Sequence, residues 1–168
     1  MLLYTDIISG DELFSDAFPI TEVDDIAYEV DCKMITINEG DIDIGANPSA
    51  EGGDDEGVEN TSQQVNNVIY TSRLAETSFD KKSYMTYIKG YMKAIKAKLE
   101  ETNPERVAVF EQKATPFVKK ILANFKDYEF YTGESMNVDG MVALLNYRED
   151  GVTPYFTFFK DGLSVVKL

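Results

Sequence analysis

The chain has 168 residues, of which 43% are hydrophobic and 12% aromatic, enough to form one domain with a hydrophobic core. It contains no histidine and a single cysteine, which excludes Ser-His-Asp and Cys-His nucleophile pairs, histidine-based zinc sites and an intrachain disulfide. The formal net charge is −14, and no apolar run approaches the roughly 20 residues that cross a bilayer, so we expect a cytoplasmic protein without membrane insertion.

Short β-strands are predicted for residues 1–37 and again at residues 68–70. Within the first region, residues 26–30 and 34–37 combine β-branched and apolar side chains in the alternating manner of strands. The run Val-Ile-Tyr at residues 68–70 has the same composition. These segments predict a β-rich part at the beginning of the chain.

Residues 38–66 differ in composition from the rest. They contain eight acidic residues and no lysine or arginine. Such a segment cannot bury enough apolar surface to offset chain entropy, so we expect a long flexible acidic loop whose middle, about residues 51–64, is mobile. Residues 41–45 (DIDIG) partly match a calcium loop, but Gly45 and Gly52 stand where an EF-hand requires oxygen ligands. We therefore expect no defined metal site and at most weak calcium binding.

Two helices follow and should form an antiparallel hairpin over about residues 77–127. Residues 77–80 (TSFD) match a capping box, and the apolar residues that follow recur with a helical period. Residues 103–105 (NPE) are a typical helix start and leave room only for a tight connection. Pro116 lies inside the second helix and predicts a kink or a restart capped by Thr115.

One face of the first helix is predicted to carry a lysine ridge. At about 100° per residue, Lys82, Lys89, Lys93 and Lys96 lie within about 60° of one another and away from the apolar stripe. Such a ridge is most often a solvated face. Here, however, residues 81–126 hold eleven basic and four acidic residues, whereas the remainder holds five basic and twenty-six acidic residues. This separation favours binding of an acidic partner, with internal neutralisation as the alternative, and disfavours nucleic acid.

The last third of the chain returns to strands. Residues 141–147 are apolar and residues 155–159 mostly aromatic, with a hairpin turn signal at residues 149–151 (EDG) between them. The structural alternative for this hairpin is a purely architectural role, in which Arg148 pairs with an acid of the core. Strands on both sides of a helical hairpin predict an α+β fold. The expected β-core comprises about residues 1–37, 67–76 and 128–168.

Two stretches resemble the signatures of a known family. Residues 44–52 (IGANPSAEG) resemble the first signature of the translationally controlled tumour protein family. Residues 130–136 (FYTGESM) and 145–155 (LNYREDGVTPY) resemble its second. The resemblance extends over essentially the whole chain. The signature positions are Ile44, Gly45, Asn47, Pro48, Ser49, Glu51, Gly133, Glu134, Tyr147, Arg148, Asp150 and Gly151.

The resemblance implies a single domain over residues 1–168 with a β-tent core, a projecting helical hairpin and a long flexible acidic loop. The core is similar to that of the nucleotide-release chaperones of Rab GTPases. The resemblance further implies a non-catalytic cytoplasmic protein, partly associated with the cytoskeleton, that binds microtubules and takes part in protein synthesis through the ribosome or elongation factors. The hairpin corresponds to the tubulin- and calcium-associated region of the family. We expect a monomer, because Leu168 ends the chain where some members carry a cysteine used for dimerisation.

Regulation of a small GTPase such as Rheb is the alternative function. The resemblance places Glu12 at the position of the proposed GTPase contact of the family, and Glu134 is a second candidate. Either acid could compete for the magnesium ion or the phosphate-binding lysine of a GTPase. The structural alternative is that Glu12 is a surface acid at a turn and Glu134 a cap. No cofactor and no catalytic residue are expected.

Overall fold

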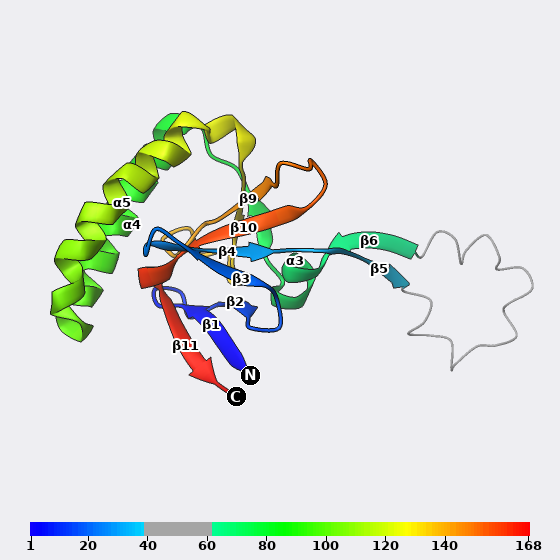
Figure 1. The fold of residues 1–168 in the computed structure, drawn as a ribbon, viewed down its shortest axis with the longest axis horizontal. Coiled ribbons are helices and arrows are strands. Elements are labelled where there is room, and N and C mark those ends of the chain that lie inside the picture. Colours follow the sequence, from blue (N-terminus) through cyan, green and yellow to red (C-terminus); the bar gives the residue numbers. More distant parts are fainter. Residues whose placement is uncertain (39–61) are drawn as a thin grey trace, which may run out of the picture.

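The computed structural model describes residues 1–38 and 62–168, and it has the expected α+β fold (Figure 1). The expected acidic loop lies largely outside these residues, as does the whole first family signature. The elements in chain order are β1 (Leu2–Asp6), β2 (Glu12–Ser15), β3 (Ile20–Val23), β4 (Ala27–Asp31), β5 (Met34–Asn38), β6 (Ser62–Asn66), α3 (Asn67–Ser72), β7 (Ala75–Thr77), α4 (Lys81–Thr102), α5 (Pro104–Ala123), η3 (Phe125–Asp127), β8 (Glu129–Thr132), β9 (Ala143–Tyr147), β10 (Pro154–Phe159), η4 (Lys160–Gly162) and β11 (Leu163–Lys167).

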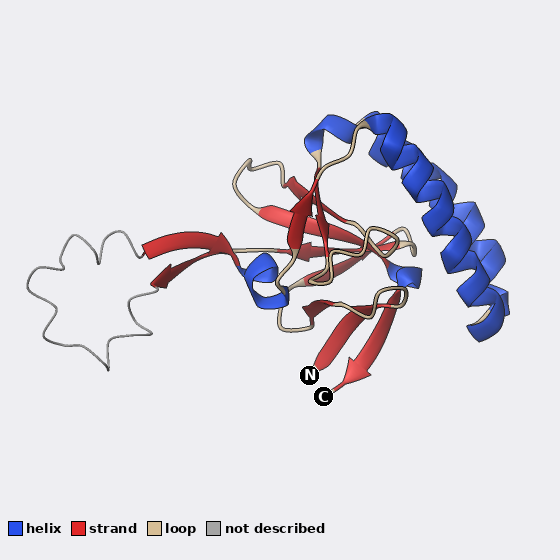
Figure 2. Cartoon of the chain, turned by 180° about the vertical axis from the view of Figure 1, so that it is seen from behind, coloured by secondary structure: helices blue, strands red, loops and turns tan. Residues whose placement is uncertain are grey.

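The described strands form three antiparallel sheets (Figure 2). The largest has the strand order β3-β4-β10-β9-β8-β7, and a second has the order β11-β1-β2. Strands β5 and β6 form a separate two-stranded ribbon, with Met34 opposite Asn66 and Asn38 opposite Ser62. The predicted boundaries of the acidic loop, residues 38–66, are therefore too wide, because both of its ends belong to this ribbon.

The predicted strand at residues 68–70 is wrong, because this segment belongs to helix α3. The side chain of Asn66 caps the helix: its Oδ1 accepts hydrogen bonds from the backbone N–H groups of Val68 (2.9 Å) and Ile69 (3.2 Å). A short apolar run is compatible with either a strand or a helical turn. The Asn66 cap favours the helical turn here.

Helices α4 and α5 lie side by side along one side of the β-core, as the hairpin prediction required (Figure 1). The capping box of α4 is formed by Asp80 and Ser83, three residues later than predicted: Asp80 Oδ1 accepts from the Ser83 N–H at 2.7 Å. Helix α5 continues through Pro116, so the predicted restart is wrong. Thr115 Oγ1 instead donates to the carbonyl oxygen of Glu111 at 3.2 Å.

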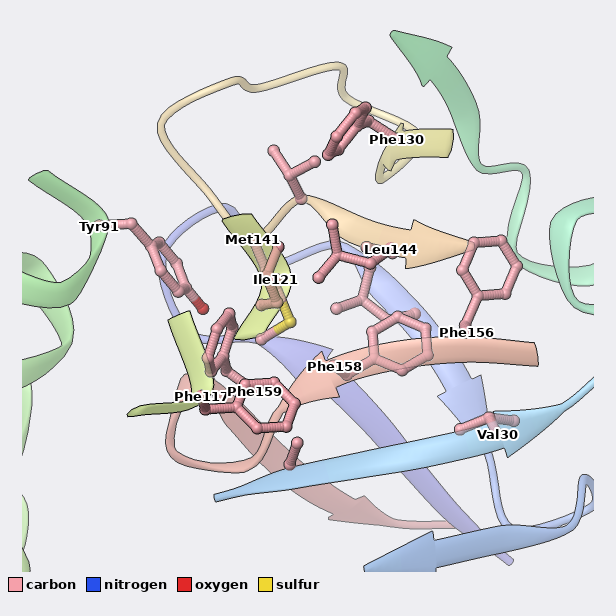
Figure 3. Packing of buried hydrophobic residues seen from close by; sticks show 14 of the residues in the cluster. Val30, Tyr91, Phe117, Ile121, Phe130, Met141, Leu144, Phe156, Phe158 and Phe159 are labelled. Atoms are coloured by element: carbon pink, nitrogen blue, oxygen red, sulfur yellow. The ribbon is translucent and has the colours of Figure 1, made fainter. Parts of the chain in front are cut away.

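A single aromatic-rich core joins the hairpin to the sheets (Figure 3). Phe159 of β10 contacts both helices. Its ring centroid lies 6.1 Å from that of Tyr91 in α4 and 5.7 Å from that of Phe117 in α5. Phe158, on the same strand, packs against Phe14 of β2 at 4.5 Å. The core therefore holds the hairpin against the sheets through the buried faces of both helices. Lysines such as Lys89 and Lys93 remain exposed.

Ion pairs fasten the start of α5 to the β-core. Arg106 contacts Asp161 in η4 and Asp25 in the β3–β4 turn. Lys160 reinforces this contact by binding Asp25 at 2.7 Å and Glu22 at 3.2 Å. Hydrogen bonds from Lys160 and Arg106 lower the pKa of Asp25 to about 2. No helix in the described part of the chain is long and apolar enough to span a membrane.

Candidate functional site

A groove of about 680 Å³ lies between α4 and α5. The antiparallel packing brings every fourth residue of each helix to this seam, because residues four apart share a helix face. The groove residues of α4 extend from Ile88 to Lys96, about 12 Å of helix length at about 1.5 Å per residue. Its apolar lining consists of Ile88, Met92, Phe110, Ala114 and Val118.

Basic residues dominate the charge around the groove. Four lysines and one acid line it, a net charge of +3 in a chain whose total charge is −14. The acid, Glu111, pairs with Lys96 at 3.3 Å, and both side chains are about half exposed. Such an exposed pair contributes little to stability, about 0–1 kcal/mol. Lys89, Lys93 and Lys119 form no ion pair with any described residue, so their charge is available to an acidic partner.

The structure brings together three of the four predicted ridge lysines. Lys89, Lys93 and Lys96 line the groove, whereas Lys82 lies in the first turn of α4 outside it. The prediction considered only the apolar stripe of the first helix itself. In the structure, the neighbouring helix completes an apolar surface beside these lysines. Lys119 of α5 was missed, since only the pairing of the two helices places it at the same groove.

Gly90 lies on the lysine-bearing side of this groove. A Cβ atom added there would meet nothing within 4 Å, and the φ angle is not positive. Glycine in a helix interior costs roughly 0.5–1 kcal/mol relative to alanine. The fold therefore does not require glycine at this position. Because Gly90 has no side chain, it leaves this side of the groove open.

Glu12 and Glu134 lie on two segments that contact each other. Asp11 Oδ2 accepts a hydrogen bond from Ser135 Oγ at 2.6 Å, which ties the start of β2 to the loop after β8. Both glutamates are exposed, and Glu134 pairs with Arg73 at 3.1 Å. The close approach also accounts for Gly133 of the second signature, because a Cβ there would lie 2.4 Å from Asp11 Cβ.

The remaining positions of the second signature build the β9–β10 hairpin. Arg148 binds Glu29 and Asp31 of β4 and lies over the ring of Tyr155, 3.9 Å from its centroid. The structural alternative for Arg148 therefore holds, with both acids on a strand of the β-core and partly exposed. Asp150 accepts hydrogen bonds from the backbone N–H groups of residues 152 and 153, and Gly151 has a φ of +72°. These residues therefore hold the turn, with Tyr147 exposed beside it.

Residues 1–38 and 62–168 contain no candidate metal centre. These residues include no group of three or more cysteine or carboxylate side chains that could hold a metal ion. The calcium-like segment at residues 41–45 lies outside the described residues.

Comparisons with known proteins cover the whole chain. A family model described as translationally controlled tumour protein matches residues 1–164. The translationally-controlled tumor protein homolog of Schizosaccharomyces pombe is 68% identical over 164 residues, 97% of each chain. The homolog of Saccharomyces cerevisiae is 58% identical over 168 residues and is covered completely.

Two solved structures share the fold along the full chain. The S. pombe translationally controlled tumor-associated protein p23fyp has a TM-score of 0.85 at 67% identity, with 100% of both chains covered. The NMR structure of the Caenorhabditis elegans protein has a TM-score of 0.73 at 31% identity, covering 100% of this chain and 99% of the other. The chain therefore belongs to the translationally controlled tumour protein family.

Proposed function

We propose that this protein is a non-catalytic binding protein whose α4–α5 groove docks an acidic surface of a cytoplasmic partner. The observation that carries the proposal is the arrangement of Lys89, Lys93 and Lys119 around an apolar floor, with no ion pair to any described residue. An acidic segment would gain electrostatic attraction at the rim and apolar contact in the groove.

The acidic tails of tubulin are the partner that this surface fits best. Extended carboxylate-rich chains would place their charges beside the lysines that line the groove. An acidic surface of the ribosome or of an elongation factor is complementary to the same charge pattern and would associate the groove with protein synthesis. With either partner, binding should weaken steeply as salt is added, because salt screens the attraction between the charges.

Co-sedimentation with microtubules tests the proposal. The wild-type chain is expected to pellet with microtubules, and the triple variant Lys89→Glu, Lys93→Glu and Lys96→Glu is expected to stay in the supernatant. Microtubules whose acidic tails have been removed by limited proteolysis should bind the wild-type chain weakly. Unchanged pelleting of the triple variant would rule out the groove as the microtubule-binding surface.

Regulation of a small GTPase is the second candidate function. The observation that favours it is the Asp11–Ser135 contact, which places the exposed residues Glu12 and Glu134 on adjoining segments. We expect the wild-type chain to accelerate the release of a fluorescent nucleotide from a Rheb-like GTPase. The variants Glu12→Val and Glu134→Ala should reduce this acceleration. If the wild-type chain at micromolar concentration does not accelerate release, this function is wrong.

Weak calcium binding by the acidic segment at residues 41–45 is a further proposal. Calcium titration calorimetry at physiological salt tests it. Micromolar affinity would contradict the expectation of a weak site, which rests on the missing EF-hand ligands.

A further inference from the structure

Strand β11 is an outer strand of its sheet, and no other strand of the described chain pairs with its outer edge (Figure 1). At its two ends, Ile7 N–H donates to the Gly162 carbonyl (3.0 Å) and Leu168 N–H donates to the Met1 carbonyl (2.9 Å). Antiparallel pairing alternates, so the even-numbered residues of β11 exchange hydrogen bonds with β1. The N–H and C=O groups of Val165 and Lys167 therefore point away from β1, and no described residue binds them.

The other outer strands of the two larger sheets are better protected than β11. Proteins block sheet edges with short strands, bulges, proline or charge. Strand β7 has three residues, β2 shifts register against β1, and β3 begins directly after Pro19. Strand β11 has five residues, an unbroken register and one charged residue, and Val165 is 52% exposed.

A cleft of about 470 Å³ lies beside this edge, between the sheet and the C-terminal end of α4. Tyr4 and Val165 are directly opposite in register, so their side chains share the face of the sheet that lines the cleft. The Tyr4 ring contacts that of Tyr28 edge-on at 5.8 Å, and Leu163 completes the apolar wall. A strand added to β11 would place every second side chain in this aromatic and aliphatic cleft.

The charged side chains next to the edge that have no ion-pair partner among the described residues are positive. The one acid that lines the cleft, Asp161, is bound by Arg106. Lys98 lines the cleft, Lys167 lies on β11, and neither forms an ion pair with a described residue. Lys160 is already bound by Glu22 and Asp25. A second copy of the chain would bring its own lysines against these and would add the repulsion between two molecules of charge −14. An acidic peptide is complementary to the same edge.

We propose that the β11 edge binds an extended acidic segment of a partner protein by strand addition. The backbone of the segment pairs with Val165 and Lys167, its alternate apolar side chains enter the cleft, and its carboxylates lie near Lys98 and Lys167. This surface shares no residue with the groove between α4 and α5. The β11 proposal can therefore be tested independently of the proposed function.

A labelled seven-residue peptide that alternates glutamate and valine is a suitable probe, measured by fluorescence anisotropy with the full chain. Two N-methylated versions carry the methyl groups either on the valines or on the glutamates, and so block opposite backbone edges of the same peptide. We expect one version to lose affinity about tenfold or more, the equivalent of about 1.4 kcal/mol, and the other to bind like the parent. Loss with methylated valine indicates antiparallel pairing, and loss with methylated glutamate indicates parallel pairing.

Two substitutions at one position test the same edge on the protein. Val165→Pro removes the outward N–H without removing a hydrogen bond to β1, and proline is tolerated in this way on edge strands. It should weaken the peptide about tenfold or more relative to Val165→Thr, which keeps the backbone donor. Urea unfolding of both variants verifies that they are folded, and the N-methylated peptides decide the matter in the wild-type chain even if Val165→Pro is unstable.

Three results would overturn the proposal. The first is equal binding of both methylated peptides, and the second is equal binding of folded Val165→Pro and Val165→Thr. The third is a dimer in sedimentation equilibrium without peptide that Val165→Pro abolishes, which would assign the edge to a second copy of the chain.

Discussion

Arg106 of helix α5 and Asp161 of η4 form a two-point ion pair. Arg106 Nε lies 2.8 Å from Asp161 Oδ1, and Arg106 Nη2 lies 2.9 Å from Asp161 Oδ2. Both side chains are shielded from solvent, with 14% and 7% of their surfaces exposed. This contact orients the hairpin relative to the β-core and therefore holds the groove between α4 and α5 in place.

Replacing Arg106 by methionine should destabilise the protein strongly. The change leaves the carboxylate of Asp161 buried without its partner, which typically costs about 3–5 kcal/mol. Urea unfolding followed by circular dichroism measures the loss. Arg73→Met is the matched control, because the Arg73–Glu134 pair is exposed and its loss should cost less than about 1 kcal/mol. Similar losses in the two variants would contradict this account of the Arg106 contact.

The stability of the protein should depend on Asp25 in acid. The folded-state pKa of Asp25 is about 2, below its ordinary value of 3.8, because Lys160 and Arg106 bind the carboxylate. Its stabilising contribution is therefore fully present above pH 3.8 and decreases as the pH falls towards about 2. Urea unfolding between pH 5 and 2 should show a smaller decrease in stability for Asp25→Asn than for wild type. Parallel pH profiles for the two proteins would show that Asp25 contributes nothing to the acid sensitivity.

Two tyrosines of α4 should differ in how much stability is lost when the hydroxyl group is removed. The Tyr87 hydroxyl donates to the Gly140 carbonyl at 2.7 Å and accepts from the Val142 N–H at 3.0 Å, whereas the buried Tyr91 hydroxyl has no hydrogen-bond partner among the described residues. Tyr87→Phe should cost about 1–3 kcal/mol, because it leaves a buried N–H and a buried C=O unpaired. Tyr91→Phe should be neutral or stabilising. Thermal unfolding compares them, and a larger loss for Tyr91→Phe would refute the assignment.

Gly90→Ala should stabilise the protein by roughly 0.5–1 kcal/mol. The position is helical and the added Cβ atom meets nothing within 4 Å, so only the gain in helix propensity remains. Gly133→Ala is the contrasting variant, because its Cβ would lie 2.4 Å from Asp11 Cβ and should destabilise the protein. The midpoints of urea unfolding measure both changes. A destabilised Gly90→Ala would mean that the fold itself requires this glycine.

The sequence predicted the hairpin well because local signals define it. A helical apolar period in α4 and the proline at the start of α5 are read without knowledge of the tertiary structure. The prediction failed at α3 and at β6, where the decisive contacts are a single Asn66 cap and the pairing with β5. Helix α3 has six residues and β6 has five, so neither element is long enough to show a periodic pattern in the sequence.

The candidate site was predicted only in part, for a related reason. The periodicity of α4 placed Lys89, Lys93 and Lys96 on one side of the helix. It could not reveal that α5 adds Lys119 and an apolar floor, because the register between two helices is a property of their packing. The cleft beside β11 likewise joins residues from both ends of the chain, which no local pattern indicates.

The most direct test of the binding account compares two double substitutions with the same change of charge. Lys89→Gln with Lys93→Gln alters the groove, whereas Lys113→Gln with Lys120→Gln alters a different side of α5. Microtubule co-sedimentation at low and physiological salt measures the affinity of each variant. The account predicts that the groove variant binds about tenfold or more weakly than the control variant, about 1.4 kcal/mol, and that its affinity depends less on salt. Equal affinities for the two variants would contradict it.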